Sequence, residues 1–149
     1  MRFLILCMLL VLVAVDASSA RASAPEVTIV VGEESYRTLR IQVSGKPDPR
    51  TVAWEIWFAN QEFRALSEAR FHGRVLRGDT SGLSRPAPGE AFEECTSNGQ
   101  SLHRTANGLP VVDPGTSAWS CDLHGMTPGQ VQWIAVIPVD AMVAPLVDS

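Results

Sequence analysis

Residues 52–59 read VAWEIWFA, and this stretch decides the fold class. Large apolar residues stand at every second position from Val52 to Phe58, which is the period of a β-strand. The opposite face carries Glu55 and Trp57. Bulk on both faces predicts a strand that is covered on one side and partly shielded on the other.

The same period recurs on both sides of this stretch. Short alternating or β-branched segments are VTIVV (27–31), YRTLRIQV (36–43), WSCDL (119–123) and VQWIAVIPV (131–139). Between them lie turns rich in glycine, proline and aspartate, such as SGKPDPR at 44–50. Six or seven short strands with turns of this kind predict an all-β chain folded as a β-sandwich.

Two segments do not follow this pattern. Residues 60–72, NQEFRALSEARFH, fit either a short helix or a strand and turn, and we expect Gly73 to end them before a short strand at 75–77. From Gly78 to Ser117 the composition changes to glycine, serine, proline, threonine and asparagine. This change predicts a long loop insertion over about 78–117.

The first 24 residues have the features of a secretory signal peptide. Arg2 precedes an unbroken apolar run over residues 3–15, and small residues follow, with cleavage sites after Ala20 or Ala24. The run is shorter than the roughly 20 residues of a membrane-spanning helix. No second long apolar run follows it, so we expect one secreted or periplasmic domain over residues 25–149, without a membrane span.

Loss of the leader removes Cys7 and leaves two cysteines, Cys95 and Cys121. In an oxidising compartment such a pair is expected to form a disulfide, which would join the long insertion to the strand at 119–123. A zinc site of Cys95, His103, Cys121 and His124 is the alternative. Zinc-binding cysteines normally come as close pairs, so we expect no metal.

Residues 123–145, LHGMTPGQVQWIAVIPVDAMVAP, resemble the end of a fibronectin type III domain. The matching positions are Leu123, Met126, Pro128 and Gly129, followed by Ile134, Val136 and Val139 at inward positions of the family's strand F. WSCDL is similar to strand E, VAWEIWFA to strand C and YRTLRIQV to strand B. The resemblance implies an immunoglobulin-like β-sandwich of about seven strands that acts as a binding or spacer module.

The chain departs from this family at several positions, and two of them lie in the segment 131–139. Gln132 stands where the family has its corner tyrosine. Pro138 lies late in a strand that should be central, where a proline removes a ladder donor. The family carries no catalytic set, so the resemblance implies no catalytic residue here.

Composition and motifs exclude several classes of function. Twelve basic and sixteen acidic residues give a net charge of −4, which is not the footprint of a nucleic-acid-binding protein. The chain has neither a Gly-x-Ser-x-Gly elbow nor a glycine-rich phosphate loop, so we expect no enzyme and no cofactor.

The candidate surface-binding residues are Trp57, Arg70, Arg74 and Arg77. The arginines belong to a cluster between Arg64 and Arg85 that either binds an anionic ligand or forms a solvated edge balanced by nearby glutamates. Trp54, Trp119 and Trp133 fit core faces by alternation, which leaves Trp57 either as an exposed ring for a carbohydrate or as a ring packed under the insertion.

We therefore expect a non-catalytic module that binds a protein or a glycan, with recognition on the 78–117 insertion, or a structural spacer. A rival hypothesis is a subunit of a surface assembly. The short tail AMVAPLVDS (141–149) would leave a sheet edge that a partner strand completes. A small metal-dependent or hydrolytic enzyme is a third hypothesis.

Overall fold

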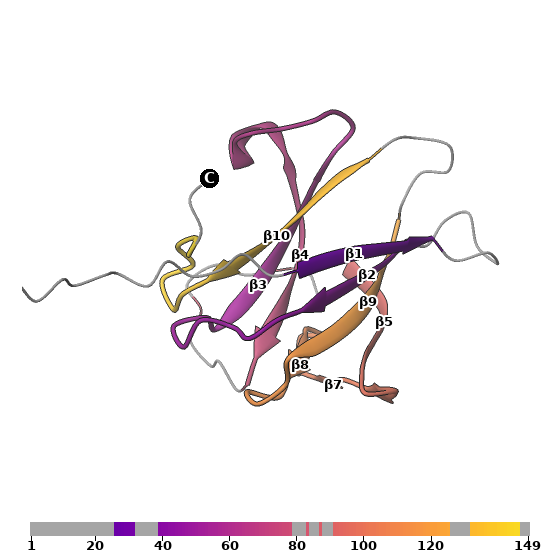
Figure 1. The fold of residues 1–149 in the computed structure, drawn as a ribbon, viewed down its shortest axis with the longest axis vertical. Coiled ribbons are helices and arrows are strands. Elements are labelled where there is room, and N and C mark those ends of the chain that lie inside the picture. Colours follow the sequence, from indigo (N-terminus) through magenta and orange to yellow (C-terminus); the bar gives the residue numbers. More distant parts are fainter. Residues whose placement is uncertain are drawn as a thin grey trace, which may run out of the picture.

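The chain folds into two five-stranded β-sheets that pack face to face (Figure 1). The computed structural model describes residues 26–31 by their backbone and residues 39–78, 83, 87, 91–125 and 132–146 in full. The predicted leader (1–24), Arg85 and the Pro128–Gly129 turn lie outside the described residues. The prediction of an all-β chain with two layers is confirmed.

The first sheet has the order β1-β2-β9-β5-β6, and all its pairs are antiparallel. Its strands are β1 (Glu26–Val31), β2 (Leu39–Ser44), β5 (Phe92–Ser97), β6 (Gln100–Ser101) and β9 (Ala118–Leu123). The second sheet has the order β10-β3-β4-β8-β7, in which only β4 and β8 run parallel. Its strands are β3 (Ala53–Ala59), β4 (Arg70–Arg77), β7 (His103–Arg104), β8 (Pro110–Val112) and β10 (Trp133–Val139).

The main core lies between the sheets and follows the predicted alternation. The first sheet contributes Ile41, Val43, Trp119, Cys121 and Leu123, and the second contributes Trp54, Ile56, Val75, Val112 and Val136. The rings of Trp54 and Trp119, which come from opposite sheets, lie 5.5 Å apart at 58°. Alternation therefore identified the inward faces of β2, β3 and β9 correctly.

A second, smaller cluster covers part of the outer face of the second sheet. It contains the buried residues Ala53, Leu76, Val139 and Val143. The chain after β10 turns back here, and Pro145 pairs with Val139. The expectation that Val139 faces inward is wrong, because it lies one position out of phase with the inward residues Ile134 and Val136.

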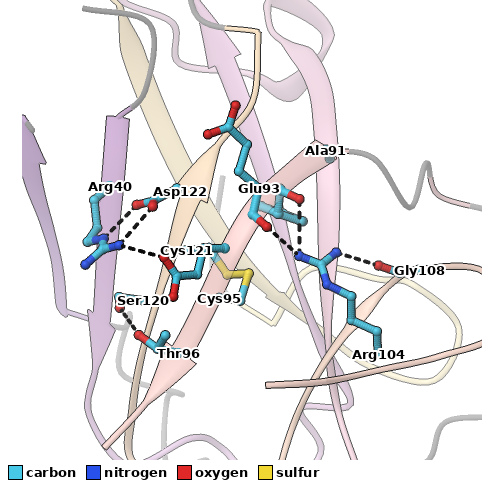
Figure 2. The surroundings of a disulfide bond; sticks show 12 residues. Arg40, Ala91, Glu93, Cys95, Thr96, Arg104, Gly108, Ser120, Cys121 and Asp122 are labelled. Atoms are coloured by element: carbon cyan, nitrogen blue, oxygen red, sulfur yellow. Dashed lines mark hydrogen bonds and ion pairs between the residues drawn. A yellow bond between two sulfur atoms is a disulfide. The ribbon is translucent and has the colours of Figure 1, made fainter. Parts of the chain in front are cut away.

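The disulfide between Cys95 and Cys121 is present as predicted (Figure 2). The two cysteines are register partners on the neighbouring strands β5 and β9, with Cα atoms 4.1 Å apart. The bond therefore lies within the first sheet.

On the outer face of that sheet the guanidinium of Arg40 donates two hydrogen bonds, of 2.6 and 2.8 Å, to the carboxylate of Asp122. This hydrogen bonding raises the pKa of Arg40.

The expectation of a loop insertion over 78–117 is wrong, because four strands, β5 to β8, lie inside it. Three of them are only two or three residues long. Such strands are too short to show a periodic pattern, and their turn-rich neighbours dominate the composition. The same shortness explains why about seven strands were expected, whereas the described residues form ten.

Residues 60–72 form neither of the two predicted structures completely. A single 3₁₀ turn spans Leu66–Glu68, where the Glu68 carboxylate accepts hydrogen bonds from the backbone N–H groups of Arg64 and Ala65. Strand β4 begins at Arg70 and continues through Gly73, which was expected to end the segment. A Cβ atom on Gly73 would lie 2.5 Å from Cβ of Ala91, so glycine permits a close approach of the two segments.

Pro138 fits into β10 because β10 is an edge strand of its sheet among the described residues. The Pro138 carbonyl accepts a hydrogen bond from the Leu146 N–H on the side away from β3. The N–H and C=O of one strand residue point to the same side, so the missing donor of Pro138 lies on that outer edge. The expectation that this strand is central is therefore wrong among the described residues.

Candidate functional site

The candidate site lies at the corner of the second sheet where β3 ends and β4 and β10 begin. Side chains on these strands alternate between the core and the outer face. Ile56 on β3 and Val136 on β10 point into the core, whereas Glu55 and Trp57 point outward. The outer face at this corner therefore consists of residues that do not contribute to the core between the sheets.

A buried ion pair anchors this outer face. The Arg74 guanidinium donates a 2.7 Å hydrogen bond to Oε1 of Glu55, its register partner on β3. The two side chains are only 1% and 2% exposed. Buried charges are retained only when they are paired and hydrogen-bonded, because each loses its hydration.

Two aromatic rings are attached to this pair. Trp57 Nε1–H donates to Oε2 of Glu55 at 3.1 Å. The Phe71 ring lies edge-on to Trp57, with centroids 5.3 Å apart, and 5.8 Å from the guanidinium carbon of Arg74. These four residues form what we call the anchored aromatic cluster. Because Trp57 and Phe71 are half-buried, each combines a fixed position with an accessible part.

A β-bulge in β4 makes this cluster possible. Trp57 pairs with Phe71 and Ile56 pairs with Gly73, so His72 is an extra residue on β4. Phe71 and Arg74 are three positions apart, and a regular strand would place them on opposite faces. The extra residue brings both to the outer face.

The bulge also turns His72 toward the core. Its Nε2–H donates a 2.8 Å hydrogen bond to the carbonyl of Ala91, and its ring lies edge-on between Phe58 and Phe92. Burial lowers the pKa of His72, although the hydrogen bond to Ala91 opposes this effect and nearby His124 adds to it. His72 is therefore favoured in its neutral form and joins the two sheets at this corner.

At the same end of the second sheet, the surface forms a hollow of about 550 Å³. Phe58 and Arg70, which line it, each stand one position from the outward-facing Trp57 and Phe71, so the hollow opens on the inner side of the sheet. The lining comes from the end of β3, the loop after it, the start of β4, the turn after β9 of the first sheet and the approach to β10, namely Phe58, Ala59, Asn60, Gln61, Glu68, Arg70, Gly125 and Gln132. Its volume falls within the range of ordinary small-molecule sites. Three of its side chains are amides, which both donate and accept hydrogen bonds.

Gln132 has an unusual environment in this hollow. Its Oε1 atom is inaccessible to solvent and has no hydrogen-bond partner among the described residues. A buried carbonyl oxygen without a donor is destabilising by about 1–3 kcal/mol. A donor from a ligand or a water molecule reaches it only if the side chain turns toward the hollow.

Trp133 lies at the edge of the same corner. It directly follows Gln132, pairs with Ala59 of the hollow and is 45% exposed. The expectation that alternation places Trp133 in the core is therefore wrong. Its position in β10 puts it on the outer face, next to the small side chains of Ala59 and Ala135, where little covers it.

The structure separates the four predicted surface-binding residues. Trp57 is half-buried in the anchored aromatic cluster, and Arg70 is exposed at the rim of the hollow. Arg74 is buried, so its placement on a binding surface is wrong. Arg77 donates hydrogen bonds to the carbonyls of Asp48, Thr51 and Pro114 and so connects loops. The three arginines do not form one patch.

The alternative zinc site is overturned by the disulfide, because both cysteine sulfurs are used in it. His124 instead has its Nδ1 atom 2.8 Å from a carboxylate oxygen of Glu93. The part of the chain that the structure describes contains no group of three or more histidine, cysteine or acidic side chains arranged to hold a metal ion.

Sequence reasoning missed Glu55, Phe71 and Gln132. One signal was available, since Glu55 is a charged residue inside the otherwise apolar VAWEIWFA. A carboxylate in a strand with bulk on both faces suggests a buried partner. Nothing comparable marks Phe71, because the bulge that turns it outward depends on tertiary contacts.

Comparison with protein-family models, with curated proteins and with solved structures found no match to this chain. A search of the described residues for a helix long and apolar enough to cross a membrane also found none.

Proposed function

We propose that the chain is a non-catalytic carbohydrate-binding module, with its binding site at the corner of the second sheet, where the outer face carries the anchored aromatic cluster and Trp133 and the inner side forms the hollow. The observation that carries the proposal is the Trp57–Phe71 pair, which a buried ion pair fixes on the same outer face as the exposed Trp133. Sugar rings present C–H faces that stack on aromatic rings and hydroxyls that pair with amides.

The chemistry of the lining supports binding over catalysis. Asn60, Gln61 and Gln132 do not titrate, and the Glu68 carboxylate already accepts two backbone N–H groups. General acid–base catalysis uses titratable groups positioned toward the substrate. Arg70 would bind an acidic or phosphorylated sugar residue at the rim.

We also propose that the protein is exported and acts in the periplasm or outside the cell. The apolar run at 3–15 with its small-residue cleavage sites supports export, and so does the disulfide. The intact mass of the exported protein checks this, with cleavage after Ala20 or Ala24 expected. A mass that retains residues 1–24 would contradict it.

A distant fibronectin type III-like relationship is part of the proposal. The strand order supports it: β2 lies between β1 and β9, and β3 lies between β10 and β4. These positions match the roles in which the segments resemble strands B, E, C and F of that family. The resemblance implies a binding or spacer module, which agrees with a carbohydrate-binding role.

The binding experiment is a glycan array with the purified protein, followed by calorimetry on the glycans retained. Trp133→Ala and Gln132→Ala should each weaken binding about tenfold, equivalent to about 1.4 kcal/mol. Gln42→Ala is the matched control, since Gln42 is an exposed amide on the first sheet and should leave affinity unchanged. Retention of no glycan, or equal affinity of all three variants, would overturn the proposal.

A further inference from the structure

Within the described part of the chain, the outer edge of β10 is paired over only part of its length. Beyond Val139, the chain turns back and pairs with the end of the strand through the Val139–Pro145 bridge and the Leu146–Pro138 hydrogen bond. No other described strand pairs with this edge of β10. The stretch Trp133–Ile137 therefore presents an edge without a partner among the described residues.

The backbone groups on that edge can be assigned. The Pro138 carbonyl points outward, and the direction alternates along a strand, so the N–H and C=O groups of Ile134 and Val136 also point outward. These two residues offer two donors and two acceptors. Unpaired groups of this kind are a template for another strand.

The side chains along this edge offer no obstacle to pairing. Residues 132–139 contain no charged residue, whereas natural edge strands are commonly protected by charges, especially lysine. Two copies of this strand would therefore meet without like-charge repulsion. The edge strands β6 and β7 of the described fold are only two residues long, which limits pairing there.

We propose that two copies of the chain pair antiparallel through their β10 edges, centred on Ala135. The free stretch has five residues with Ala135 in the middle, so a two-fold axis matches Ile134 of each copy with Val136 of the other. The Pro145 bridges then lie at the two outer ends. Four hydrogen bonds join the second sheets of both copies into one continuous sheet.

This arrangement does not depend on carbohydrate binding, but it has a consequence for it. Side chains of directly opposed residues in an antiparallel pair point to the same face. Both anchored aromatic clusters would therefore lie on one side of the joined sheet. A ligand with repeated units could then contact both sites of the dimer, and linked sites gain avidity.

The test uses a charge at the centre of the interface. In the proposed pairing, Ala135 of one copy lies opposite Ala135 of the other in a non-hydrogen-bonded pair, which is the type with the shorter Cα–Cα distance. Ala135→Lys therefore places two cations side by side. Analytical ultracentrifugation should show a dimer for the wild type and at least a tenfold larger dissociation constant for Ala135→Lys. Ala135→Glu should behave likewise, and an equimolar mixture of the two variants should recover the dimer.

Thr28→Lys is the matched control on the other long edge strand, β1, opposite the exposed Gln42. It should leave the dimer intact. Hydrogen exchange of the wild type gives a second readout that needs no variant, since the amides of Ile134 and Val136 should become more protected as protein concentration rises. A monomeric wild type up to millimolar concentration, or dissociation by Thr28→Lys alone, would overturn the proposal.

Discussion

His72 is the single extra residue in β4, and its effects reach three parts of the corner. The bulge that it creates turns Phe71 outward beside Trp57, while its own ring packs between Phe58 and Phe92. Phe58 in turn lines the hollow. The neutral state of one imidazole is therefore part of what holds the candidate site in shape.

The lowered pKa of His72 predicts a pH-dependent stability. The unfolded chain takes up a proton on this residue near its ordinary pKa of 6.5, whereas the folded protein does so only at a lower pH. The free energy of unfolding should therefore be unaffected by His72 at high pH, fall as the pH drops through 6.5, and stop falling below the folded pKa. Urea unfolding across this range measures the effect.

His72→Gln should remove this part of the pH dependence, because glutamine does not titrate. His103→Gln is the control, since His103 is exposed and should leave the slope of the wild type unchanged. An equal slope for His72→Gln and the wild type would contradict the assignment.

At the level of whole elements, the packing of β4 against the start of β5 is closer than ordinary side chains allow. Gly73 on β4 lies beneath Ala91 and Phe92, and any Cβ there would meet both.

The strands were predicted unevenly from the sequence. Strands of six or seven residues with alternating patterns, such as β2, β3 and β9, were identified, whereas the two-residue strands β6 and β7 have no period to detect.

Gly73→Ala is expected to destabilise the protein by about 1–3 kcal/mol, because the added methyl group would overpack the contact between β4 and β5. Gly115→Ala is the matched control, because a Cβ there would meet no atom within 4 Å. Its effect should stay within about 0.5 kcal/mol of the wild type. Chemical denaturation of the wild type and the two variants measures these free energies of unfolding. Equal losses of stability for both variants would show that the contact is not tight.

For the molecule as a whole, the disulfide closes a ring that passes through both sheets. After Cys95 the chain forms β6 in the first sheet, crosses to form β7 and β8 in the second, and returns to Cys121 in β9. The ring fixes the position of the crossing segment relative to both layers. Arg104 adds contacts, donating to carbonyls of Phe92, Glu93 and Gly108 (Figure 2).

Reduction of the disulfide should lower the free energy of unfolding by about 3.5 kcal/mol on the chain-entropy model for a separation of 26 residues. Guanidinium unfolding of the oxidised and the reduced wild type measures this difference without any change of side chain. Cys95→Ala/Cys121→Ala should lose at least as much, since both residues are buried. Equal stability of the oxidised and reduced forms would show that strand pairing alone positions the ring.

The fold class, the inward faces of the longer strands and the cysteine pairing follow from local information. Alternation shows which face of a strand is apolar, and only two cysteines lie outside the predicted leader. The corner of the second sheet does not follow from it. The burial of Arg74, the outward turn of Phe71 and the exposure of Trp133 depend on a one-residue bulge and on which strand ends the sheet. Both depend on contacts between segments far apart in the chain, and a local sequence pattern does not specify such contacts.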